Sequence, residues 1–375
     1  MNLVVVEGAE SYRPEVLGPA IRRLLNPLGG MGAFVRPGER VLLKPNMLAA
    51  REPERAVTTH PALLREVIGQ VREAGGIPLV GDSPGVGGIR RVAERSGLLA
   101  VIEESGAELV PFDATVTVRG GGLFREFAVA RPYLEADRLI NLPKLKTHEM
   151  MTMTCAVKNL FGAVVGAAKA GWHLKAGADR ELFARMLLEI YLLRRPDLTI
   201  VDAVLAMEGN GPGSGDPRHA GLLLAGTNPV AVDVIAAELA GIPKKLLWVE
   251  RAAECLGLDG WDRAAIETRG VAVEEAKLPP FRLPHLSDVQ FGLPRFLKNR
   301  LRHYLTSRPC EIPGACRLCG ICRDACPPGA IAIRDGRLHF DYHACIRCFC
   351  CRELCPEGAL GVRDGALMGI IRKIA

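Results

Sequence analysis

The sequence predicts an α/β protein in which a domain with a mostly parallel sheet is followed by a small α+β domain. Over residues 3–242, short apolar segments of strand type alternate with segments of helix type, which is the order expected for parallel strands joined by helices. Ten of the twelve cysteines then fall within residues 310–355. A length of 375 residues also favours two domains over one.

The expected strands are short and apolar, and turn or helix signals separate them. They cover residues 3–6, 39–46, 77–83, 107–113, 137–148, 198–203 and 221–226. The expected helices cover residues 14–28, 61–76, 152–168, 180–194 and 228–242, with a further helix from Ile89. Pro61 and Pro229 suit the first turn of a helix, behind caps at Thr59 or His60 and at Asn228. The last of these helices has an amphipathic pattern.

Polar side chains follow the expected strands where the chain leaves the sheet. They are Lys44, Asn46, Asp82, Ser83, Lys144, Lys146, His148, Asp202, Glu208 and Asn210. In open α/β sheets, ligands bind beyond the carboxyl ends of the strands. We therefore expect a binding site at this edge of the domain formed by residues 1–280.

Lysine and histidine dominate this edge, which indicates an anionic ligand. The electropositive group comprises Lys44, Lys144, Lys146, Lys158, His60 and His148. A carboxylate or phosphate would suit such a pocket, and the segment TCAVKNLFG could supply a helix N-terminus for it. Lys144, Lys146 and His148 are expected to orient the ligand, and His60 or His148 to transfer protons.

Other residues of the edge are expected to bind the substrate or a cofactor. They are Lys44, Asn46, Asp82, Ser83, Lys158, Asn159, Glu208 and Asn210. A metal site is an alternative, built from Asp82, Asp202, Glu208 and Asp233 with His60 or His148. A nucleotide at GDSPGVGG (81–88) is another, although this segment matches neither a P-loop nor a G-x-G-x-x-G fingerprint.

The cysteine-rich region contains the same spacing twice. Each run reads C-x2-C-x2-C-x3-C-P, first in residues 316–327 and then in residues 345–356. This spacing resembles that of bacterial ferredoxins, in which the fourth cysteine of each run ligates the other cluster. Two [4Fe–4S] clusters are therefore expected. The ligand sets would be Cys316, Cys319, Cys322 and Cys355 for one cluster, and Cys345, Cys348, Cys351 and Cys326 for the other.

Cys350 stands beside Cys351 and could compete with it for ligation, but the spacing to Cys355 favours Cys351. Segments 330–341 and 359–367 each read as a hairpin around Asp-Gly, which indicates an internally repeated two-cluster domain. Zinc also accepts thiolates, but its tetrahedral sites normally use two pairs of cysteines.

The net charge of +6 comes largely from residues 282–308, where six Arg or Lys residues stand against Asp288. Within this region, residues 294–305 predict a basic amphipathic helix. It could lie on a membrane surface, dock an acidic redox partner protein or pack on its own chain. The charge is too local to indicate a nucleic-acid partner. The sequence shows no signal peptide and no transmembrane segment, so we expect a cytoplasmic protein in a reducing compartment.

Several segments of the first 245 residues are together similar to the DUF362 family. They are VLLKPN (41–46), TTHP (58–61), GDSPG (81–85), LPKLKTH (142–148), TCAVKNLFGAVVG (154–166), MEGNGPGSG (207–215) and NPVAVD (228–233). The resemblance implies a DUF362-like α/β domain over 1–280 and a ferredoxin domain over 309–366. A linker (281–308) would join them, and a tail (367–375) would follow. The family name denotes a domain of undefined function, so the resemblance implies no reaction.

These features lead to a first hypothesis, an iron–sulfur oxidoreductase. In it, the ferredoxin domain relays single electrons to an anionic substrate or cofactor in the α/β domain. A second hypothesis is a non-catalytic electron carrier or adaptor that docks a redox partner. A third is a role in metallocofactor assembly.

Overall fold

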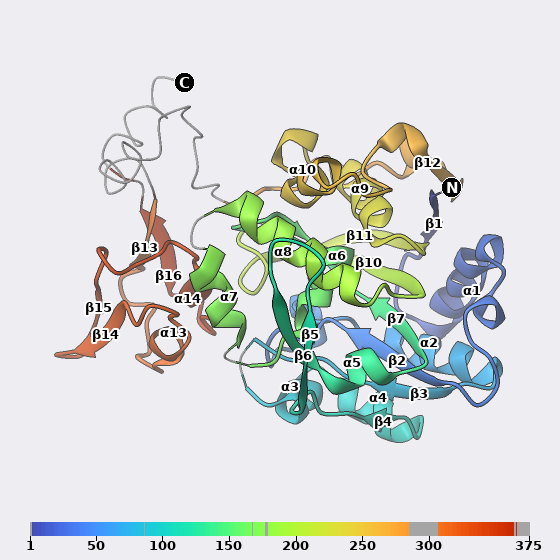
Figure 1. The fold of residues 1–375 in the computed structure, drawn as a ribbon, viewed down its shortest axis with the longest axis horizontal. Coiled ribbons are helices and arrows are strands. Elements are labelled where there is room, and N and C mark those ends of the chain that lie inside the picture. The colour runs from blue at the N-terminus through green and yellow to red at the C-terminus, as the bar shows by residue number, and fades with distance from the viewer. Residues whose placement is uncertain are drawn as a thin grey trace.

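A ten-stranded sheet organises most of the chain in the computed structural model, which describes residues 2–85, 87–166, 168–176, 179–284, 307–363 and 365 (Figure 1). The main strand order is β12 (Ile266–Gly270), β1 (Asn2–Gly8), β11 (Asp216–Gly226), β10 (Leu198–Glu208), β7 (Arg138–Leu142), β2 (Arg40–Pro45), β3 (Ile77–Val80) and β4 (Glu108–Leu109). Strand β8 (Lys144–His148) also pairs with β10, and β9 (Thr152–Thr154) pairs with β8. Strand β11 is antiparallel to both neighbours, whereas the other pairs in the main order are parallel. The expected α/β fold is thus confirmed.

Helices cover both faces of this sheet. One face carries α1 (Pro14–Leu25), α2 (Pro61–Glu73), α3 (Ile89–Arg95) and α4 (Leu98–Glu104). The other face carries α5 (Arg131–Glu135), α6 (Ala156–Asn159), α7 (Ala168–Ala176), α8 (Arg180–Leu193), α9 (Pro229–Leu239), α10 (Trp248–Cys255) and α11 (Val273–Ala276). In β2, Val41 and Leu43 pack on the first face and Leu42 on the second, because successive side chains of a strand point to opposite sides. Burial on both faces explains the continuous apolar strands of the sequence.

Shorter elements connect these layers. A hairpin of β5 (Thr115–Arg119) and β6 (Glu126–Ala130) forms a separate two-stranded sheet. Short 3-10 helices occur at Asn26–Leu28, Met31–Ala33, Pro53–Arg55, Leu160–Ala163, Lys244–Leu246 and Arg263–Ala265. No helix in the described ranges is both long and apolar enough to cross a membrane.

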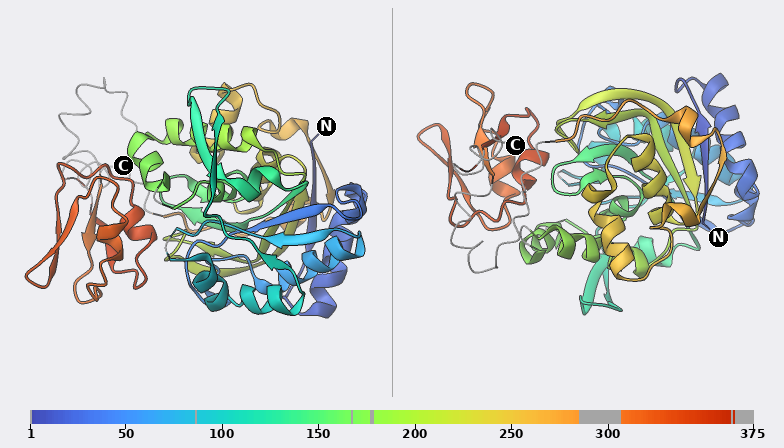
Figure 2. Two further views of the ribbon diagram at one scale, coloured as in Figure 1. Left: turned by 60° about the horizontal axis from the view of Figure 1, so that its bottom comes forward. Right: turned by 90° about the horizontal axis from the view of Figure 1, so that it is seen from above.

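The cysteine-rich segment has secondary structure of its own and lies to one side of the large sheet (Figures 1 and 2). Its elements are β13 (Arg308–Glu311), α13 (Ile321–Asp324), β14 (Ile331–Arg334), β15 (Arg337–Phe340), α14 (Cys350–Glu353) and β16 (Leu360–Arg363). The hairpin expected around Asp335 and Gly336 is confirmed as the β14–β15 pair. Strand β16 pairs instead with β13. The second half of the hairpin expected at 359–367 lies largely outside the described residues.

Local helix signals were reliable, but two expectations were wrong. Asn228 caps α9 through its side chain, and His60, rather than Thr59, caps α2. The helix expected from residue 152 begins only at Ala156, because residues 152–154 pair with β8. Helix α9 is buried almost throughout, rather than amphipathic, because it packs between the sheet and both α10 and α11. The expected helix at 294–305 and the tail at 367–375 lie outside the described residues.

Candidate functional site

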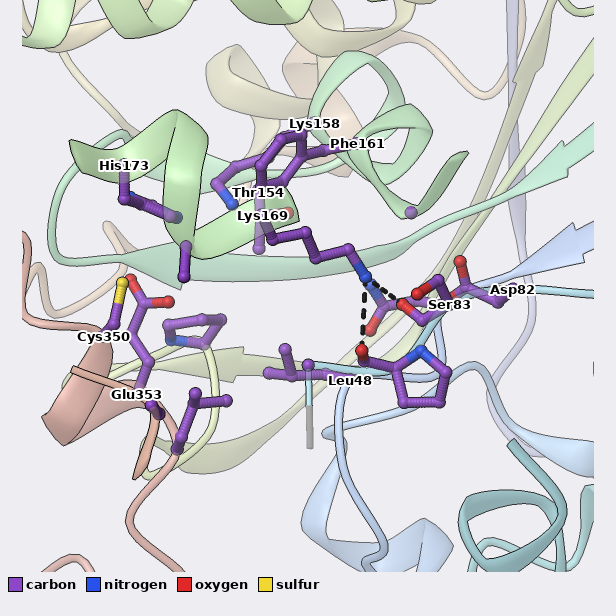
Figure 3. Close-up of a pocket in the computed structure, with 18 of the residues that line it drawn as sticks. Leu48, Asp82, Ser83, Thr154, Lys158, Phe161, Lys169, His173, Cys350 and Glu353 are labelled. Carbon is purple, nitrogen blue, oxygen red and sulfur yellow. Dashed lines mark hydrogen bonds between the residues drawn. The ribbon is translucent and has the colours of Figure 1, made fainter. Parts of the chain in front are cut away.

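A cavity of about 370 Å³ lies beyond the carboxyl ends of β2 and β3, between the sheet domain and the cysteine-rich segment (Figure 3). Six residues that the sequence places at the sheet edge line it: Asn46, Asp82, Ser83, Lys146, Lys158 and Asn159. Helix α14 closes the cavity on another side with Cys350 and Glu353. Two segments far apart in the sequence therefore form a single cavity, which we call the shared pocket.

A buried ion pair supports one wall of the shared pocket. Lys44 Nζ lies 2.7 Å from Asp82 Oδ1, while the backbone N–H of Met47 donates to Asp82 Oδ2 at 2.8 Å. A Cβ atom at Gly162 would lie 1.9 Å from Asp82 Oδ1 and 2.5 Å from Lys44 Nζ. Residue 162 must therefore be glycine for this pair to pack against it. The amide of Asn159 also donates to the carbonyl of Lys44, at 3.2 Å.

Three further lysines line the shared pocket. Lys146 Nζ donates to Asn46 Oδ1 and to the carbonyl of Val57, both at 2.8 Å. Lys169 Nζ donates to the carbonyls of Ser83 and Pro84. Lys158 Nζ lies 5.7 Å from the ring centroid of Phe161, and no hydrogen bond or ion pair joins it to another described residue.

Burial disfavours the charged form of each of these amines. It lowers the pKa of Lys146 well below its usual range, and the positive charges of Lys158 and Lys144 lower it further. Burial also lowers the pKa of Lys158, and it lowers that of Lys169 to about 7. The shared pocket therefore gathers amines whose charged form the protein alone stabilises poorly.

His148 joins the sheet edge to helix α14. Its Nδ1 accepts the backbone N–H groups of Met150 and Met151, at 3.0 and 3.2 Å. A neutral His148 therefore carries its proton on Nε2, which lies 3.2 Å from Glu353 Oε1. Burial lowers the pKa of His148 well below its usual range, so the neutral form is favoured. The ring does not line the shared pocket but contacts Glu353, which does.

Other contacts fix α14 against the sheet domain. Arg352 Nη1 lies 2.8 Å from Glu149 Oε2, and the side chain of Arg51 donates to the carbonyl of Pro356 at 2.6 Å. A Cβ atom at Gly213 would lie 2.3 Å from the carbonyl oxygen of Glu353. The cysteine-rich segment is therefore in direct contact with the loops at the sheet edge.

Lys144 and His60 belong to a second buried cluster, away from the shared pocket. Lys144 Nζ donates to Asp202 Oδ2 and to the hydroxyl of Tyr12, both at 2.9 Å. The Tyr12 hydroxyl donates to Asp202 Oδ1 at 2.6 Å, and its ring stacks on His60 with centroids 3.5 Å apart. The backbone N–H of His60 also donates to Asp202. These residues join the first loop of the chain to the start of α2.

The remaining carboxylates of the edge have separate partners. Glu208 pairs with Arg218 and Arg282, and Asp233 accepts the backbone N–H groups that begin α6. Asn210 is exposed and does not line the shared pocket. The structure therefore does not bring Asp82, Asp202, Glu208 and Asp233 together. In the described ranges, no three His, Cys, Asp or Glu side chains converge as a site for a single metal ion.

The first expected set of cluster ligands surrounds a small cavity of its own. Cys316, Cys319, Cys322 and Cys355 all line it, although Cys355 comes from the second run. Burial, together with these neighbouring thiols, raises the pKa of Cys322 to about 11.

The second expected set is also grouped. Burial raises the pKa of Cys351 well above its usual range, and the nearby Cys348, Cys345 and Cys326 raise it further. Backbone N–H groups donate to sulfur in both sets, from Leu318 to Cys316 (3.4 Å), from Ala330 to Cys326 (3.2 Å) and from Ala359 to Cys355 (3.2 Å). Grouped soft sulfur ligands with N–H donors fit a metal cluster.

Comparison with known proteins identifies the family of the chain. A family model described as a domain of unknown function (DUF362) matches residues 41–238. A thylakoid-associated protein of Synechocystis sp. (strain ATCC 27184 / PCC 6803 / Kazusa) is 41% identical over 302 residues, which cover 79% of this chain and 92% of that relative. The chain belongs to the DUF362 family.

Two solved structures are similar to part of this DUF362 chain at low identity. The lactate racemase apoprotein of Thermoanaerobacterium thermosaccharolyticum has a TM-score of 0.41 and 12% identity over 64% of this chain. A Thermotoga maritima protein has a TM-score of 0.40 and 15% identity over 63% of this chain. The matches span 57% and 60% of those two chains.

Cys350 of this DUF362 protein has a different position from the expected ligands. It lines the shared pocket, next to Glu353 (Figure 3). A hydrogen bond with the Cys348 thiol, followed by burial, raises the pKa of Cys350 well above its usual range. The thiol is therefore close to the second cysteine set while it faces the cavity.

Sequence reasoning missed several residues of the shared pocket in this DUF362 chain. Lys169 and His173 come from α7, and Glu353 comes from the cysteine-rich segment. Lys169 is a lone charge in a run of small apolar residues, and that pattern could have indicated a functional lysine. No local pattern marks Glu353, because its role depends on how two distant segments pack.

Proposed function

We propose that this protein is an iron–sulfur oxidoreductase whose cysteine-rich segment passes single electrons to an anionic ligand in the shared pocket. One observation carries the proposal. Helix α14 contributes Cys351 to the second cysteine set and also presents Cys350 and Glu353 to the pocket. An electron carrier that also walls a ligand cavity is suited to reduce or oxidise what the cavity holds.

The eight grouped cysteines would hold two [4Fe–4S] clusters, in the sets with exchanged fourth ligands given above. Such clusters, when bound, supply one-electron transfer at potentials set by charge, hydrogen bonding and burial. The N–H donors to sulfur and the partial burial of both sets support this assignment. In this proposal, residues 1–280 form the ligand-binding domain and residues 309–366 the ferredoxin domain, joined by residues 281–308.

The chain's own residues would hold and orient the ligand. Lys146 and Lys158 would bind its negative charge, and the Asn46–Asn159 pair would fix their surroundings. His148 would hold Glu353 in place by the close contact of its Nε2 with Oε1. Lys144 and His60 would have a structural role in this proposal, since their contacts with Asp202 and Tyr12 shape the loop that leads into α2.

A reoxidation assay tests the proposal. The full chain would be reconstituted anaerobically, reduced with dithionite and mixed with candidate anions while cluster absorbance is followed. We expect at least one anion to accelerate reoxidation in the wild type and in Lys175→Met, but not in Lys158→Met. Lys175 is the matched control, because it lies on α7 but is exposed and outside the pocket. If no anion accelerates reoxidation in any protein that carries its clusters, the oxidoreductase proposal is wrong.

The exposed side of the first cysteine set favours a second candidate, an electron carrier that docks a redox protein. Cys319 is exposed and Leu318 is 36% exposed, and both line the cavity of that set. A partner could therefore approach this set without entering the shared pocket. In this case reoxidation by the partner would be unchanged in Lys158→Met.

The cytoplasmic location stays a prediction of the sequence.

A further inference from the structure

The shared pocket gathers more amines than carboxylates. Lys146, Lys158 and Lys169 line it, and Lys44 lies directly behind the wall. Against these four amines stand two buried carboxylates, Asp82 and Glu353. The third carboxylate of the lining, Asp324, is exposed and pairs with Arg323. With every group charged, the pocket lacks two negative charges.

Polar groups without partners also face this cavity. The Lys146 amine has three N–H donors and uses two of them in hydrogen bonds. The Lys158 amine makes no hydrogen bond to another described residue. Nδ1 of His173 is buried without a hydrogen-bond partner in the described part of the chain, and the whole residue is 6% exposed. Buried donors and acceptors without partners are destabilising, so a bound ligand that satisfies them is stabilised in turn.

Part of the lining is apolar and limits the size of the ligand. Leu48, Phe161 and Leu354 contribute carbon surface, together with Pro84 and Pro212. A volume of about 370 Å³ suits a metabolite and excludes a polymer. The occupant should therefore combine a short carbon body with its charges.

We propose that the shared pocket binds a small organic dianion, whose two negative charges lie among Lys146, Lys158 and Lys169. This inference rests on the proposed function, because it defines the charge and size of the anionic ligand named there. Dicarboxylates and phosphate monoesters share this chemistry. A dianion would neutralise the excess charge, whereas a monoanion would leave one buried positive charge uncompensated.

Proton uptake is a measurable consequence of this charge balance. The pKa of Lys169 is lowered to about 7 by burial and by Lys44 and Lys158, and Asp82 opposes the shift. At pH 7.5 this amine is therefore mostly neutral in the free protein. Two added negative charges favour its protonated form, so binding should raise its pKa and take up a proton.

Calorimetry with the reconstituted, oxidised full chain tests the dianion proposal. The probes are succinate and succinamate, which have nearly the same size but carry two charges and one, and propyl phosphate, a phosphate monoester that carries close to two charges at pH 7.5. Titrations at pH 7.5 in two buffers of different ionisation enthalpy give the number of protons taken up. We expect a dianion to bind at least about tenfold more tightly than succinamate, with net proton uptake. The tighter of the two dianions identifies the class.

Two variants at residue 169 distinguish an effect of the amine's charge on binding from an effect of the substitution on folding. Arginine keeps its proton at any working pH, so Lys169→Arg should bind the dianion without proton uptake. Lys169→Met should lose both the uptake and most of the affinity. Lys175→Met should behave as the wild type. If dicarboxylates of three to six carbons and the phosphate monoester all bind no more tightly than their monoanionic counterparts, the dianion proposal is overturned.

The two proposals fail separately. A dianion that binds with proton uptake but never accelerates reoxidation would remove only the oxidoreductase proposal. A monoanion that accelerates reoxidation, while no dianion is preferred, would remove only the dianion proposal.

Discussion

His148 Nε2 on β8 lies 3.2 Å from Glu353 Oε1 on α14, and this contact joins the polar edge of the sheet to the helix that carries Cys351. The two residues are far apart in the sequence. Because Nδ1 of His148 accepts two backbone N–H groups, the proton of a neutral ring is on Nε2, the nitrogen that contacts Glu353. The relative position of the cysteine-rich segment is therefore fixed by buried polar contacts as well as by packing.

The neighbouring Glu149–Arg352 pair should stabilise this contact strongly. Both side chains are nearly buried, so Glu149→Leu would leave the Arg352 charge without a carboxylate partner. Burial, partly offset by Arg352, raises the pKa of Glu149 to about 7, so the test belongs at pH 8, where the carboxyl is ionised. We expect a loss of about 3 kcal/mol in the free energy of unfolding, measured by urea denaturation of the reconstituted protein.

The matched control for Glu149→Leu is Glu135→Gln, which breaks the exposed pair between Arg131 and Glu135. Exposed pairs contribute roughly 0–1 kcal/mol, so this variant should resemble the wild type. Equal losses in the two variants would show that the Arg352 contact is not a buried ion pair in solution.

Gly162 should be irreplaceable for a steric reason. In Gly162→Ala the new Cβ would overlap Asp82 Oδ1 and approach Lys44 Nζ, and so separate the buried ion pair. We expect a loss of about 2–4 kcal/mol in unfolding free energy, and at least about tenfold weaker anion binding by calorimetry. Gly171→Ala, on α7 with open space at the Cβ position, should be neutral or slightly stabilising. An unchanged Gly162→Ala variant would mean that the wall relaxes easily.

The elements that the sequence predicts best are those determined locally. Asn228 caps α9 because its side chain reaches two N–H groups of the same turn, and Pro229 suits the position that follows. The error at residues 152–154 has the opposite origin. That segment is a strand only because β8 lies beside it, and no local pattern records this pairing.

The residues of the candidate site also fall into two groups, those that the sequence could predict and those that depend on the packing of distant segments. Asn46 and Asp82 follow short parallel strands, so their place at the sheet edge could be expected from strand order. Glu208 was expected there too, but β10 continues to residue 208 and carries it roughly 20 Å beyond Asp202 along the strand. Lys169 and Glu353 could not be predicted, because they reach the pocket only through the packing of distant segments.

Cysteine variants should distinguish ligands from the thiol that faces the pocket. The reconstituted wild type should contain roughly eight irons per chain, and Cys351→Ser should lose about half of them with one cluster. Cys350→Ser should retain all of the iron, because Cys350 lines the shared pocket. Iron and sulfide analysis with electron paramagnetic resonance of the reduced proteins gives the result. Greater iron loss in Cys350→Ser than in Cys351→Ser would reverse the ligand assignment.

Glu250 should make stability fall as pH rises. Burial raises its pKa to about 8, so the folded protein binds a proton that the unfolded chain releases above pH 4.5. Folding therefore opposes ionisation of this carboxyl, and the folded protein loses stability as the pH rises from 4.5 to about 8. Glu250→Gln keeps the neutral form and should exceed the wild type in unfolding free energy by on the order of 4 kcal/mol at pH 8, with little difference at pH 4.5.

Denaturant unfolding of Glu250→Gln at several pH values checks this expectation. Glu254→Gln, an exposed change on the same helix, serves as the control and should follow the wild-type curve. A pH-independent difference between Glu250→Gln and the wild type would show that the carboxyl is not the cause.

His60 tests whether the second buried cluster takes part in chemistry. In the structure His60 caps α2 with Nδ1 and stacks on Tyr12, but it does not line the shared pocket. Asparagine is also a good N-cap, so His60→Asn should keep the helix start and lose only the imidazole and its stacking. We expect a modest loss of about 1 kcal/mol in stability and no change in ligand-dependent reoxidation. A rate that falls about tenfold or more, in a variant that still binds the anion, would instead support proton transfer by His60.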